Sequence, residues 1–155
     1  MEVGSICNRQ VRTIYEDETL INAARRMLNT DTNALVVISR EQKLSDPIMM
    51  PVALLKDRDI VMGGILVCRD EELCGLRVHD VMSHELVVVY EHTPLDQAFT
   101  IMQEHHLHYL PVLNDHGALV GLLSLDQLLA WVAEELNQAA DVLAYSDWSG
   151  SSLSV

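Results

Sequence analysis

The chain has 155 residues, of which 49% are apolar and 21% charged, a composition typical of a globular domain with a real core. No apolar run approaches the roughly 20 residues that a membrane-spanning helix needs. The first fifteen residues contain Glu2, Arg9 and Arg12 and show no signal-peptide pattern. Three cysteines without a framework spacing favour reduced thiols. These features exclude a wholly disordered chain and predict a cytoplasmic protein without a membrane anchor.

The net charge of −13 is unevenly distributed. Residues 1–77 carry ten basic and twelve acidic side chains, whereas residues 78–155 carry eleven acidic side chains and no lysine or arginine. Because nucleic-acid affinity depends on cations that neutralise phosphates, DNA, RNA and anionic membrane surfaces are poor partners. A small anionic ligand would have to find its cations in the first half of the chain.

The first half is predicted to fold as strand, helix, strand, strand, helix. A β-rich run covers residues 11–15, and Thr19 is a suitable N-cap for the helix that follows. Apolar strands are expected at 34–38 and 52–55, and a second helix starts near Asp57. A linker that opens on Gly63-Gly64 follows.

The second half shows the same order of elements. A strand is expected at 86–90, then a helix with Thr93 as N-cap and Pro94 at its first position. Strands at 109–113 and 119–123 flank a turn at Asn114–Gly117. The last helix runs from Leu125 to about Tyr145, and the serine-rich residues 146–155 predict a loose tail.

This similarity of the two halves reflects an internal repeat. A shift of 75 residues aligns 3–39 with 78–114 without a gap, and a shift of 68 then aligns 52–55 with 120–123. Eight aligned pairs are identical, among them Val3 with Val78 and Tyr15 with Tyr90. The predicted divisions are a first repeat at 1–66, a linker at 67–77, a second repeat at 78–136, and a helix extension with its tail at 137–155.

Two motifs carry a resemblance to a known family. Residues 53–60 read Ala-Leu-Leu-Lys-Asp-Arg-Asp-Ile, and residues 121–128 read Gly-Leu-Leu-Ser-Leu-Asp-Gln-Leu. Together with His108-Tyr109-Leu110-Pro111-Val112, they make the chain resemble a tandem CBS-domain pair, or Bateman module, of the small stand-alone bacterial type. The resemblance covers residues 3 to about 136 and leaves no room for a catalytic domain, so the chain is predicted not to be an enzyme.

The resemblance implies a fold, an assembly and a ligand. The fold is α/β (α+β), with two βαββα repeats related by pseudo-two-fold symmetry, and the assembly is a disc-like homodimer that signals to a regulated partner protein. The ligand is an adenosyl compound, with AMP, ADP or ATP ahead of S-adenosylmethionine and NADH, and no cofactor is required. A carboxylate at the helix start can accept the ribose hydroxyls, and helix amides can hold a phosphate.

Each cleft of this family combines the motif of one repeat with the first two strands of the other. For site one the resemblance implies Leu54, Lys56, Arg58, Asp59, Val87, Val88, His108, Tyr109 and Pro111. For site two, the weaker site, it implies Arg12, Thr13, Asn33, Ala34, Leu122, Ser124 and Gln127. Lys56 departs from the family's hydroxyl but supplies a cation. Gln127 replaces the ribose-binding carboxylate with a single neutral acceptor.

Other interpretations stay open. Asp59 is also typical of a carboxylate that only caps its helix, and decayed sites would leave a protein-interaction scaffold. The cluster His105, His106 and His108 raises a zinc-linked function, although neighbouring helical side chains diverge and no metal is predicted. Trp131 fits either the core of its own repeat or a dimer interface. The charge distribution favours antiparallel over parallel pairing of two discs.

Overall fold

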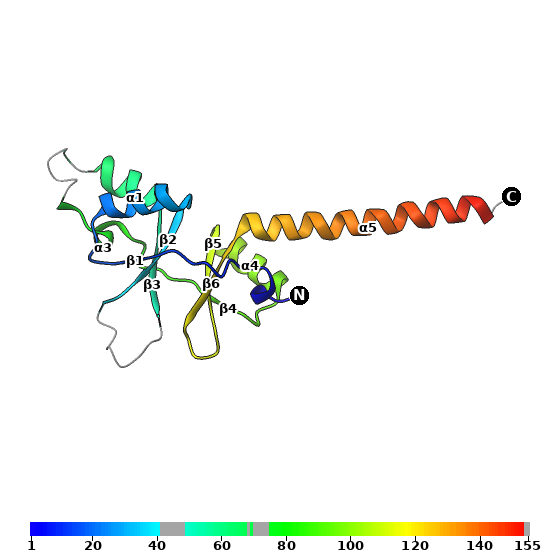
Figure 1. Cartoon of the computed structure of the whole chain (residues 1–155), viewed down its shortest axis with the longest axis horizontal. Coiled ribbons are helices and arrows are strands. Elements are labelled where there is room, and N and C mark those ends of the chain that lie inside the picture. Colours follow the sequence, from blue (N-terminus) through cyan, green and yellow to red (C-terminus); the bar gives the residue numbers. More distant parts are fainter. Residues whose placement is uncertain (41–48, 68, 70–74, 154–155) are drawn as a thin grey trace.

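The structure is a computed structural model that describes residues 1–40, 49–67, 69 and 75–153. Figure 1 shows two small sheets side by side with helices packed on them, and one long helix that extends away from this body. The elements in chain order are η1 (Val3–Ser5), β1 (Thr13–Tyr15), α1 (Leu20–Thr30), β2 (Ala34–Ile38), β3 (Pro51–Lys56), α2 (Asp57–Ile60), η2 (Val61–Ile65), α3 (Val78–Val81), β4 (Val89–Tyr90), α4 (Leu95–His105), β5 (Tyr109–Leu113), β6 (Leu119–Ser124) and α5 (Leu125–Leu153).

The two sheets have the same topology and register. In each, the first strand runs parallel to the second, and the second runs antiparallel to the third. Ala34 pairs with Lys56 in one sheet and Tyr109 pairs with Ser124 in the other, and both registers shift at the end of the middle strand. The duplicated βαββα fold predicted from the sequence is thereby confirmed.

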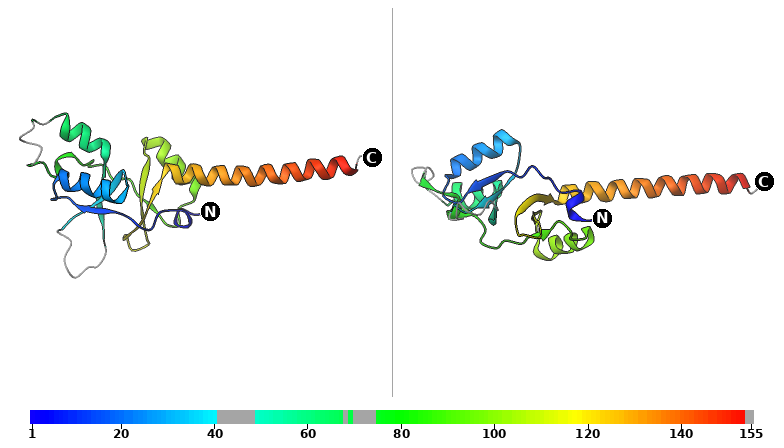
Figure 2. Two further views of the ribbon diagram at one scale, coloured as in Figure 1. Left: turned by 45° about the horizontal axis from the view of Figure 1, so that its top comes forward. Right: turned by 60° about the horizontal axis from the view of Figure 1, so that its bottom comes forward.

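The first segment of each repeat packs against the other repeat. The amide of Val3 donates to the Thr93 carbonyl at 2.8 Å, and the amide of its counterpart Val78 donates to the Glu18 carbonyl at 2.9 Å. Val3 is buried in the core of the second repeat and Val78 in that of the first. Figure 2 shows the N-terminal segment beside the second repeat. The packed units therefore exchange their first segments and do not coincide with the divisions of the sequence repeat.

A third apolar cluster joins the two sheets. Ala34, Val36 and Leu54 of the first sheet are buried there, and Tyr109 and Leu122 of the second sheet pack against them. Because side chains alternate along a strand, the same strands bury their other faces in their own repeat's core. The two clefts of the molecule lie at the edges of this junction.

The helix starts follow the repeat, with one difference from the prediction. The Thr19 hydroxyl accepts from the Asn22 amide at 3.2 Å, which confirms it as the N-cap of α1. Helix α4 instead has Pro94 at its N-cap, and the Thr93 hydroxyl accepts from the Tyr90 amide at 3.0 Å. The hydroxyl closes the preceding turn and is therefore not the cap.

Element lengths differ from the prediction in two places. The first strand of each repeat is shorter than expected, because β1 begins only at Thr13 and β4 only at Val89. Helix α5 reaches Leu153, so the expected loose tail is wrong for residues 146–153. Serine and glycine lower helix propensity without forbidding a helix, and no proline interrupts this stretch. Trp131 packs against the core of the second repeat.

Candidate functional sites at the junction of the two sheets

Site one is a narrow cavity between the two repeats. Its walls include Leu54 and Lys56 from β3, Tyr109 and Pro111 from β5, and Val87 from the segment before β4. Its remaining lining residues are Ser83, Glu85, Leu86 and Leu107. The cavity volume is about 40 Å³, whereas ligand pockets usually measure about 300–1,000 Å³. The cavity is therefore smaller than a typical ligand pocket.

Site two is a wider, more polar cavity on the other side of the junction. Its volume is about 190 Å³. From the predicted set it brings together Arg12, Ala34 and Leu122. Its other lining residues are Asn8, Gln10, Val11, Thr30, Asp31 and Thr32.

The two cavities are equivalent under the sequence repeat. Seven pairs of lining residues are related by the offsets of 75 and 68: Asn8/Ser83, Gln10/Glu85, Val11/Leu86, Arg12/Val87, Thr32/Leu107, Ala34/Tyr109 and Leu54/Leu122. The prediction omitted the segments 8–11 and 83–86 that precede the first strands. The gapless alignment already paired these segments, and their small or polar residues could have indicated a cleft wall.

Only some of the predicted residues line the cavities. Tyr109, Val87 and Arg12 line them, whereas their neighbours His108, Val88 and Thr13 do not. On β5 the choice follows strand alternation, because Tyr109 and Pro111 lie on one face of the strand. In the segments before the first strands, adjacent residues such as Leu86 and Val87 line the same cavity. The His108 side chain instead lines a hollow between α4 and α5. His108, Val88 and Thr13 are thus predicted site residues that line neither of these two cavities.

The signature residues at the two strand-to-helix turns make equivalent hydrogen bonds. Asp59 Oδ2 accepts from the Lys56 amide at 2.9 Å, and Gln127 Oε1 accepts from the Ser124 amide at 2.8 Å. The Ser124 hydroxyl also accepts from the Gln127 amide at 3.2 Å. Asp59, Arg58, Ser124 and Gln127 thus lie at the turns that follow the cavity-lining strands, outside the cavity walls themselves.

These turns leave different acceptor capacity for a ligand. A carboxylate has two oxygens and about four lone-pair sites, so Asp59 keeps room for hydroxyl donors after it binds the Lys56 amide. The amide of Gln127 has one oxygen, which the Ser124 amide already engages. Asp59 is therefore the better candidate for holding two adjacent hydroxyls of a sugar.

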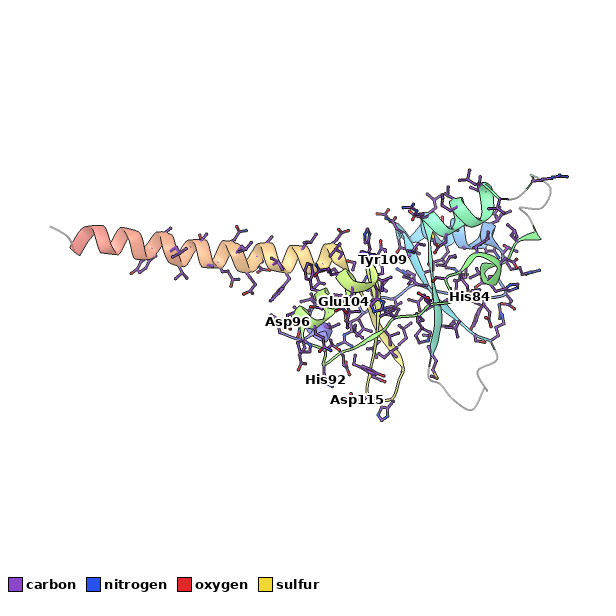
Figure 3. The ribbon with its side chains drawn as sticks, turned by 180° about the vertical axis from the view of Figure 1, so that it is seen from behind. His84, His92, Asp96, Glu104, Tyr109 and Asp115 are labelled. Atoms are coloured by element: carbon purple, nitrogen blue, oxygen red, sulfur yellow. The ribbon has the colours of Figure 1, made fainter. Side chains whose placement is uncertain are left out.

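Tyr109 is the aromatic residue of site one. It lies where the two halves of the body meet (Figure 3) and is half-buried against the first sheet. Burial raises the pKa of Tyr109, as do the charges of Asp126 and Asp57, and a hydrogen bond with Asn33 partly opposes this shift. The phenol therefore stays protonated at neutral pH, and Tyr109 contributes an uncharged aromatic side chain to the cavity lining.

Each cavity contains one cation and one acid. Lys56 and Glu85 line site one, and Arg12 and Asp31 line site two. A phosphate in either cleft would meet a single cationic side chain. Among the residues that the structure describes, no three His, Cys, Asp or Glu side chains group together to hold a metal ion.

Comparison with known proteins identifies the repeat. The family model for the CBS domain matches residues 3–62 and 78–134. An uncharacterised protein of Methanopyrus kandleri is 22% identical over 83% of this chain and 61% of its own length. A homoserine O-acetyltransferase of Methanosarcina acetivorans is 24% identical over 83% of this chain. The chain spans only 21% of that enzyme, so the likeness is confined to one part of it.

Solved structures share the fold. A CBS domain protein of Thermoplasma acidophilum superposes with a TM-score of 0.72 at 23% identity, over 84% of this chain and 68% of its own. CBSX2, solved in complex with AMP, superposes with a TM-score of 0.69 at 19% identity, over 86% of this chain and 96% of its own. A CBS domain pair in complex with 5′-methylthioadenosine and S-adenosyl-L-methionine superposes with a TM-score of 0.72 at 15% identity, over 87% of this chain and 98% of its own. No helix in the described part of this chain is long and apolar enough to cross a membrane.

Proposed function

Because the chain belongs to the CBS-domain family, with a matched repeat in each half, we propose that it is a regulatory module that binds an adenosyl compound between its repeats. Two structural neighbours were solved with such ligands, AMP in one and 5′-methylthioadenosine and S-adenosyl-L-methionine in the other. AMP, ADP and ATP are the first candidates here. The module acts as a sensor in the cytoplasm, and its output goes to a partner protein.

The observation that carries the proposal is the composition of site one. Leu54, Val87 and Pro111 provide apolar surface, and Tyr109 adds an aromatic ring, which together suit an adenine base. Lys56 lines the same cavity and can hold a phosphate as a point charge. Asp59, one helical turn beyond Lys56, supplies the acceptors for the ribose hydroxyls.

Binding in site one is coupled to movement of the repeats. The cavity of about 40 Å³ is far smaller than a nucleoside. A ligand therefore selects a more open arrangement of the two sheets, and only this difference in affinity can shift the population toward it. Such a shift is the signal that a partner protein would read.

The first test is a thermal-shift titration of the full chain with AMP, ADP, ATP, S-adenosylmethionine and NADH. GTP, which carries guanine in place of adenine, is the control nucleotide. Saturation at about 100 times Kd stabilises by roughly 2.7 kcal/mol. At about 2–4 °C per kcal/mol for a chain of this size, the expected rise in Tm is roughly 5–10 °C. A flat response to the adenosyl compounds, with a normal melting transition, would contradict the proposal.

The second test assigns the ligand to site one. Asp59→Asn keeps an oxygen for the Lys56 amide but removes the charge and the second oxygen, so AMP affinity should fall about 10- to 100-fold. Asp80→Asn is the matched control, because Asp80 Oδ2 accepts from the Arg77 amide at 2.8 Å in the same way, at α3 and away from the cleft. Equal AMP affinity in the two variants, measured by calorimetry, would remove Asp59 from the site.

A second candidate function rests on the departures from the family motif. Lys56 and Gln127 stand where the family has a hydroxyl and a ribose-binding acid, and both turns are already hydrogen-bonded internally. Those observations favour an interaction scaffold that has lost its ligands. A folded chain whose Tm does not change with any compound in the titration would support the scaffold over the sensor.

A further inference from the structure

Helix α5 continues well beyond the part of the chain that matches the family. The CBS match ends at residue 134, whereas α5 runs to Leu153. Figures 1 and 2 show this extension leaving the body without another element beside it. Residues 132–145 are all exposed. Because an isolated helix is only marginally stable in water, an extension of this length gains stability chiefly by packing against another helix.

The extension carries an apolar seam with coiled-coil spacing. Its residues alternate steps of three and four, which corresponds to positions a and d of a heptad. This α5 seam consists of Leu129, Val132, Leu136, Ala139 and Leu143. Leu129 is 51% exposed, and Leu136 and Leu143 are each 65% exposed. A stripe of large aliphatic side chains in open water is the pattern of a surface that a second helix covers.

The placement of acids on α5 fits a second copy of this chain. In the same heptad Glu134 and Asp141 occupy position f, which points away from a partner helix. Glu135 occupies position g and would face Ala140 at position e of a parallel partner. Two parallel copies of α5 can therefore pair without bringing two acids face to face, even though residues 78–155 contain no lysine or arginine.

The base of the seam indicates the direction of pairing. Val132 also lines an apolar hollow of about 400 Å³, which Phe99 of α4 and Trp131 of α5 help to form. Phe99 is 45% exposed. Parallel helices place the two hollows together at the two-fold axis, where each copy covers the same surface of the other. Antiparallel helices would leave each hollow far from its counterpart.

From these observations we infer that two copies of the chain associate in parallel through the α5 seam and the hollow at its base. The total charge of the chain favours antiparallel discs, but charges beyond about 8 Å are screened at physiological salt, so the local contacts decide. The inference concerns assembly and holds whichever ligand the clefts bind.

The test compares two matched charge substitutions in the full chain. Leu136→Glu with Leu143→Glu puts acids into the α5 seam, whereas Asn137→Glu with Ala144→Glu puts the same charges one residue further, at outward b positions. Sedimentation equilibrium should show a wild-type dimer, a dissociation constant raised by roughly 100-fold or more in the seam variant, and a control within about threefold of wild type.

Cross-linking tests the direction without adding charge. In a background with Cys68→Ser and Cys74→Ser, Ala139→Cys should form a disulfide between copies, because a parallel seam brings position d against itself. Gln138→Cys, at the neighbouring position c, should not. This pair still tests the inference if the glutamate substitutions melt the helix, which circular dichroism would reveal.

The dependence of association on ionic strength distinguishes a second copy of the chain from a basic partner protein as the occupant of the α5 seam. Raising the salt from about 0.1 M to about 1 M shortens the screening length from about 10 to 3 Å, so pairing of two acidic helices should strengthen. A wild-type chain that stays monomeric at both salt concentrations would overturn the inference. A seam variant that dimerises as well as wild type would also overturn it, as would disulfide formation at residue 138 in place of 139.

Discussion

Gly121 is a residue of the second sheet that the exchanged N-terminal segment approaches closely. A Cβ added there would lie 2.6 Å from Cys7 Sγ and 3.3 Å from the Asn8 carbonyl oxygen. Asn8 also exchanges two backbone hydrogen bonds of 2.9 Å with Leu122, so the segment cannot shift freely. We expect Gly121→Ala to destabilise the chain by about 1–3 kcal/mol through overpacking, measured by urea unfolding.

A double-mutant cycle identifies the cause of that loss. Cys7→Ala removes the sulfur that the new methyl group would meet, so its combination with Gly121→Ala should cost less than the sum of the single changes. Gly75→Ala is the control, because a Cβ there would meet nothing within 4 Å. Strictly additive single costs would mean that Cys7 is not the obstacle.

His92 lies between the acidic side chains of Glu2, near the N-terminus, and Asp115 of the second repeat. Its Nδ1 lies 3.5 Å from Glu2 Oε2 and its Nε2 lies 3.5 Å from Asp115 Oδ2, and Figure 3 shows His92 and Asp115 at the same end of the body. The hydrogen bond of His92 with the Glu2 carboxylate raises the pKa of His92, and the charge of Asp115 adds to this. The stabilisation is therefore complete below the ordinary histidine pKa of about 6.5 and is lost as the pH rises through the higher folded value.

Glu2→Gln tests this pH dependence. Proton NMR titration should show the pKa of His92 above about 6.5 in wild type and closer to that value in the variant. The wild type should also melt above the variant at about pH 5.5, with the difference shrinking by about pH 8.5. A difference in Tm that grows toward alkaline pH would contradict the assignment.

At the scale of elements, the exchange of first segments makes a prediction about regional stability. Val3 is fully buried in the core of the second repeat and Val78 in that of the first. Val3→Ala removes about two buried methyl groups, worth roughly 2 kcal/mol with the cavity that remains. Native-state hydrogen exchange should speed up in α4 and β5 of the second repeat.

Val78→Ala is the mirror-image control for this prediction. It should speed up exchange in α1 and β2, with the second repeat less affected. If Val3→Ala loosened the first repeat instead, the segment would pack within its own repeat, as the sequence divisions suggest.

The exchange of first segments between the repeats is a feature that the sequence could not predict. Apolar periodicity and the Thr19 cap predicted the helices and middle strands, because both are local features of the chain. The 75-residue repeat predicted the duplicated fold for the same reason. No local pattern shows that Val3 and Val78 cross to the opposite repeat, since their apolar environment is equivalent in either core. The sequence likewise could not show that the α5 seam is exposed, because an apolar helix face has the same spacing whether a core or a partner covers it.

The candidate sites show a similar division between local and tertiary information. From the motif at 53–59, Leu54 and Lys56 line a cavity, and from the motif at 121–127, Leu122 does. The sequence indicated both His108 and Tyr109, and only the packing of the strands shows that Tyr109 lines the cavity of site one and His108 a different hollow. The small volume of site one depends on how the two sheets pack, which the sequence of either strand does not determine.

At the scale of the whole molecule, α5 is the element that would report movement of the repeats. The Leu125 amide donates to the His108 carbonyl at 2.8 Å, so the start of α5 is fixed to the second sheet. Opening of site one separates Leu54 and Lys56 of the first sheet from Tyr109 and Pro111 of the second. A long helix fixed to one sheet converts a small rotation there into a larger displacement along its length.

Spin labels on the two sides of the cleft would measure this displacement. Arg25 in α1 and Glu134 in α5 are both exposed and can be replaced by cysteine, and Cys68→Ser with Cys74→Ser leaves the buried Cys7 as the only other cysteine. Labelled chains diluted into unlabelled chains confine the measurement to one copy. Saturating AMP should shift the label distance, and adding Asp59→Asn should abolish the shift at the same AMP concentration. A distance that stays fixed while calorimetry shows AMP bound would mean that the cleft takes its ligand without moving the repeats, and the sensor mechanism would then be wrong.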